Sequence, residues 1–396
     1  MGKAIFLNFP THGCINSLLG TVSELVNRGQ KIIYYCTEEF RNKIEQTGAE
    51  FRPYKGVVNT FKIENDDLSK AIELSVEMAV DKLEHNLEAI RKEDPDYIVH
   101  DSLCTWGKQM AVILGCPSVN LMHSFPVTKS SFTFSKQTAL LLAKVGFYKI
   151  KNKLKTNSPK KILKQKYNIN LSLADTMINR ESLNIVYTSR HMAPDSFQSK
   201  KDFVFVGPSL FFKKEPSNFP FGRLANRKVV YISLGTLHNN NPSFYDMCIR
   251  AFRESEYIVV ISIGFQIDPI DFSDYPHNFI IKRSVPQQIL LKQVDLFITH
   301  AGMNSVNEAV CCGVPMLLLP HQFEQYLIAQ KVEEMGIGRL MTIKKMTPSI
   351  LYKHVHKLIN DSKIKEQAEK YKVLFSQEEK LAHVKAADEI LGYIRK

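Results

Sequence analysis

The stretch that decides the fold is Thr299-His300-Ala301-Gly302-Met303-Asn304-Ser305-Val306-Asn307-Glu308. It lies between two apolar runs, residues 294–298 and 316–320, whose length and composition are typical of buried strands. Residues 305–312 predict a short helix that Gly313 ends, with a proline two positions further on. The predicted order is therefore strand, loop, helix, strand, and the loop delivers polar side chains to the start of a helix.

The start of this helix is suited to a phosphate group. Free backbone N–H groups and the positive end of the helix dipole attract anions. Gly302 lets the backbone approach a ligand closely, and His300, Asn304 and Ser305 can all donate hydrogen bonds. The same residues also fit a capping box, S-x-x-E, in which Ser305 and Glu308 only close the helix end. Taken alone, the stretch leaves both interpretations open.

Further polar residues lie beside the neighbouring strands. Gln287 precedes the strand at residues 294–298, and the pair Glu324-Gln325 follows the strand at residues 316–320. Open α/β sheets bind ligands at the carboxyl ends of their parallel strands. This neighbourhood favours ligand binding at the 299–308 stretch.

Apolar runs and helical periodicity alternate along both halves of the chain. Strands are predicted at residues 4–9, 31–36, 97–101, 118–121, 185–188, 203–206, 229–236, 258–263 and 279–281, and helices at residues 18–27 and 66–92. Such alternation predicts the α/β class, with parallel sheets and helices on both faces. Residues 207–220 have the Pro-, Lys- and polar-rich composition of a linker. Two doubly wound, Rossmann-like domains are therefore expected.

Composition sets the broad class of protein. The chain has 396 residues, of which 44% are hydrophobic and 23% charged, as in a globular protein with two domains. No apolar run reaches the roughly 18 residues of a membrane span, and the first residues are typical of a strand, not of a secretory signal. The seven cysteines are scattered without a C-x-x-C pair. This pattern argues against a disulfide framework and against a metal site. It predicts a cytoplasmic location.

The net charge of +12 indicates an acidic partner. Much of the excess lies between Lys149 and Lys166. The favoured interpretation is a solvated helical face, and the alternative is weak contact with an anionic membrane surface or acceptor. Nucleic acid is not expected, since no recognised binding motif accompanies the charge.

Together these motifs resemble the donor signature of UDP-sugar-dependent glycosyltransferases, in the bacterial macrolide-type branch related to the plant and animal enzymes. The resemblance covers nearly the whole chain, and its motifs are Ser284-Val285-Pro286-Gln287, His300 to Ser305, Glu308, Gly313-Val314-Pro315, Pro320 and Glu324-Gln325. It implies the GT-B fold, in which two Rossmann-like domains face each other across a cleft. The implied parts are an acceptor domain at residues 1–210, a linker at 211–226, a nucleotide-sugar domain at 227–378 and a last helix at 379–396 that packs back on the first domain.

The resemblance also implies a role for each donor residue. The set comprises Gly235, Thr236, His300, Gly302, Asn304 and Ser305 at the diphosphate, Glu308 at the ribose hydroxyls, Glu324 and Gln325 at the sugar, the Val285 backbone at the uracil edge, and Gln287 in the same site. Two positions depart from the family. Glu324 stands where the family usually has Asp, and Ser284 stands where an aromatic residue commonly stacks on the base, with Arg283 as a candidate to cover the ring instead.

The catalytic residues that the resemblance implies are a histidine base, within Pro-x-x-Gly-His-x-Asn-Pro after the first strand, and a partner carboxylate. The base position holds Cys14, and the carboxylate matches Asp101. Three interpretations stay open: His12 acts with Asp101, Asp101 acts directly or through Cys14 or a water, or the protein binds a nucleotide sugar with little or no transfer. As purely structural residues, Cys14 would be a small buried hydrophobe, Asp101 a helix cap, and His100 and His123 packed or surface histidines.

The expected function is inverting transfer of a hexose, with glucose as the leading sugar, from a UDP-sugar to a hydroxyl of a small hydrophobic natural product or antibiotic. Apolar residues at Phe125, Phe132, Phe134 and 140–147 would line the acceptor pocket or a helical core. The alternatives are a weak or inactive nucleotide-sugar-binding homologue, a membrane-associated lipid glycosyltransferase and a nucleotide-sugar epimerase. A dinucleotide dehydrogenase is disfavoured because the first βα loop lacks G-x-G-x-x-G. No cofactor or metal is expected, since no D-x-D-type site is evident and the helix N-terminus can neutralise the diphosphate.

Overall fold

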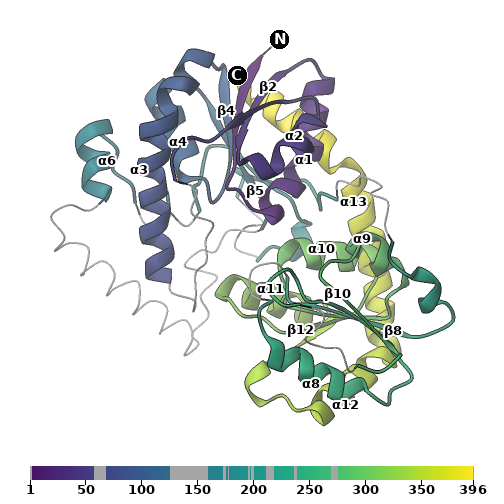
Figure 1. The fold of residues 1–396 in the computed structure, drawn as a ribbon. Helices are drawn as coiled ribbons and strands as arrows, with labels where there is room; N and C mark the ends of the chain where they lie inside the picture. The colour runs from purple at the N-terminus through teal and green to yellow at the C-terminus, as the bar shows by residue number, and fades with distance from the viewer. Residues whose placement is uncertain are drawn as a thin grey trace. The chain divides into compact units, whose positions relative to one another are not determined.

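The computed structural model describes residues 2–57, 68–124, 159–172, 175–176, 178–194, 197, 200–210, 218–235, 239–268 and 275–395. The chain forms two compact units (Figure 1). Unit 1 comprises Met1–Phe211 and Glu378–Lys396, and unit 2 comprises Phe212–Gln377. Each is an α/β unit built on a parallel sheet, so the predicted fold class is confirmed.

Unit 1 is built on a seven-stranded sheet with the order β3-β2-β1-β4-β5-β6-β7, and every neighbouring pair is parallel. The strands are β1 (Lys3–Leu7), β2 (Lys31–Cys36), β3 (Glu50–Pro53), β4 (Tyr97–Asp101), β5 (Ser118–Met122), β6 (Asn184–Val186) and β7 (Phe203–Phe205). Side chains alternate between two cores: Phe6 belongs to the core on one face, and Ile5 and Leu7 to the core on the other. Both faces of the sheet are therefore buried, as parallel sheets require.

Helices cover both faces of the first sheet (Figure 1). On one face lie α3 (Leu68–Glu93), α4 (Thr105–Leu114) and α6 (Pro159–Tyr167). On the other lie α1 (His12–Asn27), α2 (Arg41–Glu45) and the last part of α13 (Ser362–Ile394). Short 3-10 turns at Glu38–Phe40 and Arg190–Met192 complete the regular elements described in this unit.

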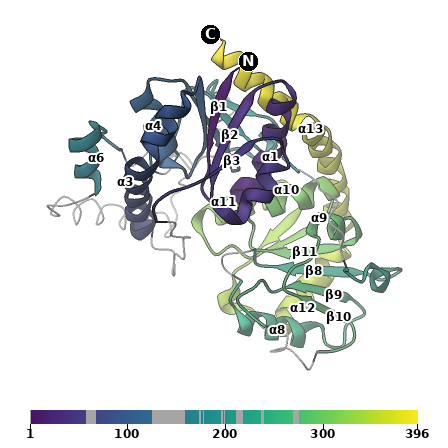
Figure 2. The ribbon, with the colours of Figure 1, turned by 45° about the horizontal axis from the view of Figure 1, so that its top comes forward.

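Unit 2 is built on a six-stranded parallel sheet with the order β10-β9-β8-β11-β12-β13. The strands are β8 (Val229–Ser233), β9 (Ile258–Ser262), β10 (Phe279–Lys282), β11 (Leu296–Thr299), β12 (Met316–Leu318) and β13 (Gly338–Leu340). On one face α8 (Pro242–Phe252) packs beside α12 (Pro348–Ile359), as Figures 1 and 2 show. Within the described residues this unit also contains α9 (Gln287–Leu290), α10 (Met303–Cys312), α11 (Phe323–Glu334) and the first part of α13. Its 3-10 turns are at Phe221–Leu224, Leu291–Gln293 and Ile343–Lys345.

The last helix, α13, is longer than predicted. It begins at Ser362, not near residue 379 or 380. Small and branched side chains on its last turns, Ala382, Ala386, Ala387 and Ile390, are buried in the core beside α1. A Cβ on Gly20 of α1 would lie 2.2 Å from the His383 ring, so glycine is needed for this close approach.

Several other boundaries differ from the prediction. The first helix begins at His12, not at Leu18, because Thr11 caps it by accepting from the Cys14 N–H at 3.4 Å. Residues 229–236 were predicted as a strand that enters a small-residue turn, and the strand ends at Ser233. The short strands β3 and β13 were not predicted, since four and three residues carry too little periodicity. Among the helices of the described ranges, none is long and apolar enough to cross a membrane.

Candidate functional site

The sheet of unit 2 has one point where the strand order changes direction. The chain runs outward through β8, β9 and β10 on one side, and through β11, β12 and β13 on the other. Gly235 follows β8, and His300 follows β11, the strand that pairs with β8. The structure therefore brings these two predicted site residues together at the topological switch point, where open α/β sheets bind ligands.

The ring of His300 is packed between two glycines. A Cβ on Gly235 would lie 2.5 Å from His300 Cε1, and a Cβ on Gly302 would lie 2.5 Å from His300 Nε2. Gly235 also has a φ of +80°, a backbone conformation that residues with a Cβ rarely adopt. These two positions therefore require glycine because of the histidine between them.

The loop after β11 turns sharply into α10. Ala301 has a φ of 65°, in the left-handed region, where a residue with a Cβ is strained by about 1–2 kcal/mol. The N-cap of α10 is Gly302, and no side chain caps this helix. The capping-box interpretation of Ser305 and Glu308 is therefore wrong, because the helix begins two residues earlier than predicted. The first turn of a helix presents backbone N–H groups, a suitable site for an anion.

Glu308 is held instead by two glutamines. Its carboxylate accepts from Gln287 Nε2 at 2.6 Å and from Gln288 Nε2 at 3.0 Å. Gln287 also donates to Ser305 Oγ at 3.2 Å. Burial raises the pKa of the Glu308 carboxyl, and the two glutamine hydrogen bonds oppose that rise. Glu308, Gln287 and Ser305 thus form one cluster beside the first turns of α10.

Tyr231 fixes the orientation of this cluster and was missed by sequence reasoning. Its hydroxyl donates to Gln287 Oε1 at 2.8 Å, and its ring stacks on Phe297 with centroids 4.7 Å apart. Tyr231 is buried within β8. Its apolar neighbours in the sequence predict a buried strand residue and give no sign of a polar role. Nothing in the pattern of a buried strand signals that its hydroxyl meets a site residue.

The remaining predicted donor residues lie near the same sheet edge or outside the described residues. Gln325 is buried, and its Oε1 accepts from the N–H groups of His321 at 2.9 Å and Gln322 at 3.2 Å, so it orders the start of α11. Glu324 beside it is exposed. Val285 is half-buried, and Thr236 lies outside the described residues.

The region before Val285 contains an exposed aromatic side chain. Ser284 is exposed, and Arg283 forms an ion pair with Asp268 at 2.8 Å. The Gly264 N–H donates to the Arg283 carbonyl at 3.0 Å, which places the next residue, Phe265, beside this segment. Phe265 is 78% exposed.

In unit 1, Asp101 is the last residue of β4 and is fully buried. Its Oδ1 accepts from the N–H groups of Leu103 at 2.7 Å and Cys104 at 3.0 Å, and its Oδ2 accepts from the Phe9 N–H. Burial raises the pKa of Asp101, while the charge of His123 and the backbone hydrogen bonds oppose that rise. The carboxylate is thus rigidly held at the carboxyl end of the sheet, and it also orders the turn before α4.

Cys14 and His12 lie on the same first turn of α1 but have different surroundings. Cys14 is 2% exposed, and its Sγ lies 3.7 Å from His123 Nε2. His12 packs edge-on against Phe40 with ring centroids 4.9 Å apart. Burial and the charge of Lys43 lower the pKa of His12, while Glu39 opposes them. The structure thus pairs Cys14 with His123, whose position one residue after a strand was the only sequence signal.

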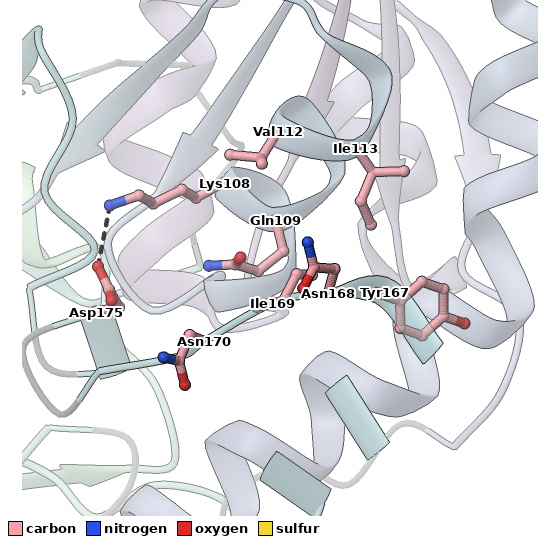
Figure 3. A pocket seen from close by; sticks show the side chains of 9 residues that line it. All are labelled: Lys108, Gln109, Val112, Ile113, Tyr167, Asn168, Ile169, Asn170 and Asp175. Carbon is pink, nitrogen blue, oxygen red and sulfur yellow. Dashed lines mark hydrogen bonds and ion pairs between the residues drawn. The ribbon is translucent and has the colours of Figure 1, made fainter. Parts of the chain in front are cut away.

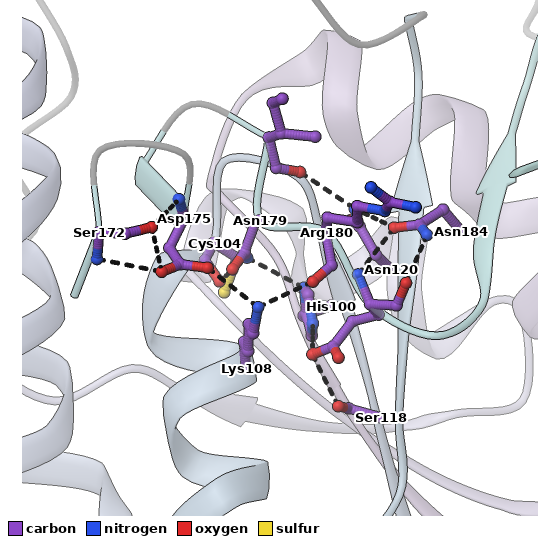
Figure 4. Close-up of polar contacts among 12 residues, drawn as sticks. His100, Cys104, Lys108, Ser118, Asn120, Ser172, Asp175, Asn179, Arg180 and Asn184 are labelled. Atoms are coloured by element: carbon purple, nitrogen blue, oxygen red, sulfur yellow. Dashed lines mark hydrogen bonds and ion pairs between the residues drawn. The ribbon is translucent and has the colours of Figure 1, made fainter. Parts of the chain in front are cut away.

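His100, by contrast, is a structural residue. Its Nε2 lies 3.1 Å from Glu181 Oε1, and its Nδ1 lies 3.2 Å from Asn179 Nδ2, within the polar cluster of Figure 4. Ser118 Oγ also donates to Glu181 at 2.7 Å. Burial would raise the pKa of Glu181, but the hydrogen bonds from His100 and Ser118 and the charge of Lys108 outweigh it, so the pKa is lowered.

A pocket of about 490 Å³ lies on the outer side of α4 (Figure 3). It is lined by Lys108, Gln109, Val112, Ile113, Tyr167, Asn168, Ile169, Asn170 and Asp175. Lys108 is paired with Asp175 at 3.0 Å. The lining comes from the middle and end of α4, away from the strand ends that carry Asp101, so this pocket is not part of the candidate site. Within the described ranges, no group of three or more His, Cys, Asp or Glu residues is arranged to hold a metal ion.

Known proteins match the chain over its whole length. The family described as UDP-glucoronosyl and UDP-glucosyl transferase matches residues 212–378. The NDP-glycosyltransferase YjiC of Bacillus licheniformis is 34% identical over 402 residues, which are 99% of this chain and 97% of that protein. The oleandomycin glycosyltransferase of Streptomyces antibioticus is 24% identical over 93% of this chain and 85% of its own. Among solved structures, the glycotransferase of kitacinnamycin superposes with a TM-score of 0.80 at 25% identity, covering 98% of both chains.

Proposed function

We propose that this chain, which belongs to the UDP-glycosyltransferase family and is a nucleotide-sugar-dependent glycosyltransferase of the GT-B fold, uses UDP-glucose as its donor. It transfers the glucose, with inversion, to a hydroxyl of a small apolar acceptor. The observation that supports this best is the cluster at the switch point of unit 2. There, His300 between two glycines, the N-terminus of α10 and the Gln287–Glu308 pair lie together.

Each part of a UDP-sugar has a complementary group in unit 2. The diphosphate would bind the first N–H groups of α10 and His300, because a helix N-terminus and an imidazole N–H both donate to anionic oxygen. The vicinal ribose hydroxyls would donate to the Glu308 carboxylate, which Gln287 and Gln288 already orient. Glu324, exposed at the start of α11, and the neighbouring Gln325 would bind the sugar hydroxyls. No step of this binding needs a metal ion.

The uracil ring needs an apolar face as well as the Val285 backbone. We assign that face to Phe265, since Ser284 is too small to stack and Arg283 is paired with Asp268. Phe265 lies beside the segment that carries Val285, and most of its ring is accessible. Stacking of a base on an aromatic side chain contributes about 1–3 kcal/mol in single-stranded nucleic-acid sites.

Unit 1 would supply the acceptor site and the proton transfer. Asp101 is a buried carboxylate at the carboxyl end of the sheet, suited to stabilising a nearby cation when a base takes the acceptor proton. Residues 125–147, where apolar side chains were expected to line the acceptor pocket, lie outside the described residues. Of the basic segment between Lys149 and Lys166, the described part is α6, where Lys166 pairs with Glu84 at 2.8 Å. Weak contact with an anionic membrane stays a proposal, tested by salt-sensitive sedimentation with anionic vesicles.

The test is turnover with a panel of donors and acceptors. The purified protein is incubated with UDP-glucose, UDP-galactose or UDP-N-acetylglucosamine and with phenolic or macrolide acceptors, and released UDP is measured. We expect acceptor-dependent UDP release that is fastest with UDP-glucose. Calorimetric binding of UDP without release from any combination would support the alternative of a silent nucleotide-sugar-binding protein. Conversion of the donor without an acceptor would instead indicate an epimerase.

A further inference from the structure

Three neighbouring strands of unit 1 bring three titratable side chains to one edge. Cys14 lies in the first turn of the helix that follows β1, Asp101 ends β4, and His123 comes directly after β5. The sheet order is β1-β4-β5, and Asp101 is in register with Leu121, two residues before His123. The topology therefore places the His123 imidazole beside Cys14, the position at which the resemblance implies a histidine on α1.

We propose that His123 is the catalytic base of the transfer reaction, and that its imidazole occupies the space left by the short side chain of Cys14. This inference rests on the proposed function. Its Nε2 lies 3.7 Å from Cys14 Sγ, so the ring reaches the position from which a longer side chain at residue 14 would act. The base thus comes from the end of β5 and not from α1.

The hydrogen bonds of the two histidines near Asp101 distinguish their roles. Both ring nitrogens of His100 have partners within the protein, at Glu181 and at Asn179. The Nδ1 of His123 is buried without a hydrogen-bond partner among the described residues, and the side chain as a whole is only half-buried. Its Nε2 contacts Cys14 Sγ, so His123 is not held by the protein through both ring nitrogens as His100 is, and Nε2 is the nitrogen that we assign to proton exchange with a substrate.

The Asp101 carboxylate interacts with His123 at this edge of the sheet. Burial raises the pKa of Asp101, and the largest effect that opposes this rise is the charge of His123. In a histidine–carboxylate pair the carboxylate can orient the ring and stabilise the cation that forms when the base takes a proton. Other titratable groups near this edge include Cys14, Cys36, Cys104, Tyr34 and Tyr54, all buried, together with His100. None of them carries a permanent charge.

The other two candidates fit less well. Cys14 carries a thiol whose reference pKa is about 8.5, compared with about 6.5 for imidazole, so it is a poorer match to neutral pH. His12 packs against Phe40, and its charged neighbours are Lys43 and Glu39. Its ring therefore interacts with the segment after β2 and not with the carboxylate at the end of β4.

The step balances as a single displacement. His123 Nε2 takes the proton of the acceptor hydroxyl while the hydroxyl oxygen forms a bond to the anomeric carbon of the sugar. The bond from that carbon to the diphosphate oxygen breaks, and UDP leaves with the electron pair. Asp101 stabilises the imidazolium until the proton passes to solvent after product release.

The test compares kcat for the wild-type protein with kcat for His123→Ala. We expect kcat to fall by about 10²–10⁴-fold, the usual contribution of a general base. Added imidazole should restore part of the rate, which a purely structural role would not produce. His85→Ala is the matched control, because His85 is an exposed histidine of the same unit whose ring contacts Asp81 within α3. It should leave kcat unchanged.

A second variant separates chemistry from folding. Cys14→His combined with His123→Ala moves the imidazole to α1. We expect the kcat of this double variant to be at least tenfold higher than that of His123→Ala alone. Loss of rate in His12→Ala with full rate in His123→Ala would overturn the proposal and assign the base to His12. Slow hydrolysis of UDP-glucose, with water as acceptor, provides the same comparison. A wild-type protein that neither transfers nor hydrolyses would refute the proposed function itself, and the base role with it.

Discussion

Replacing Tyr231 by Phe tests whether the buried hydroxyl under the donor site controls nucleotide binding. The variant keeps the ring and its stacking on Phe297, and it removes the hydroxyl that donates to Gln287 Oε1 and that also interacts with Ser233 and Ser262. Loss of one neutral hydrogen bond corresponds to about 1 kcal/mol. Because Gln287 orients Glu308, we expect that loss to appear in UDP binding as about a fivefold higher Kd.

The assay is calorimetric titration with UDP, paired with thermal unfolding. Tyr187→Phe is the matched control, since Tyr187 is equally buried in unit 1 and its hydroxyl lies 2.6 Å from Thr21 Oγ1. Both variants should lose similar stability, and only Tyr231→Phe should weaken UDP. If Tyr231→Phe lowers the stability but leaves the Kd for UDP at the wild-type value, Gln287 does not act in nucleotide binding and the reasoning is refuted.

Three further predictions concern other features of the two units. Gly235→Ala should weaken UDP binding at least tenfold, because its Cβ would lie 2.5 Å from the His300 ring. Gly29→Ala, with the same φ of +80° but open space around it, should cost only about 1–2 kcal/mol of stability. Equal Kd values for UDP in the two variants, measured by calorimetry, would contradict this prediction. Phe265→Ala should raise the KM for UDP-glucose about tenfold with little change in kcat, and an unchanged KM in steady-state kinetics would rule out its stacking role. The pKa of Glu181 is lowered in the folded state, so its contribution to stability is present above its ordinary value of 4.5 and is lost as the pH falls through the folded value; Glu181→Gln should therefore have a Tm that falls less on acidification than the wild-type Tm, and parallel Tm profiles would disprove this linkage.

The sequence predicted the regular parts of the fold because buried parallel strands are long apolar runs. The strands at residues 31–36 and 97–101 match β2 and β4. The start of α10 was misplaced because S-x-x-E is a capping pattern that any helix can contain, and only the backbone of Gly302 reveals the true N-cap. Likewise, nothing local showed that α13 extends from Ser362, because its charged sequence has little periodic apolar character.

The residues of the proposed donor site could be chosen from the sequence because they fall on consecutive loops with a recognisable spacing. The contacts that orient it were not, because they join residues far apart in the chain. Tyr231 meets Gln287, and Cys14 meets His123, only through the order of the strands in each sheet. A histidine one residue after a strand has no distinctive pattern, so its nearness to Asp101 depends on the pairing of β4 with β5.

The most direct test of glucosyl transfer is the identity of the product formed from UDP-glucose and a phenolic acceptor. Mass spectrometry and the anomeric proton coupling in NMR are measured on the purified product. The account predicts a hexose adduct with the β configuration, inverted relative to the α-linked donor. Intact acceptor beside protein that still binds UDP, or an adduct with retained configuration, would contradict it.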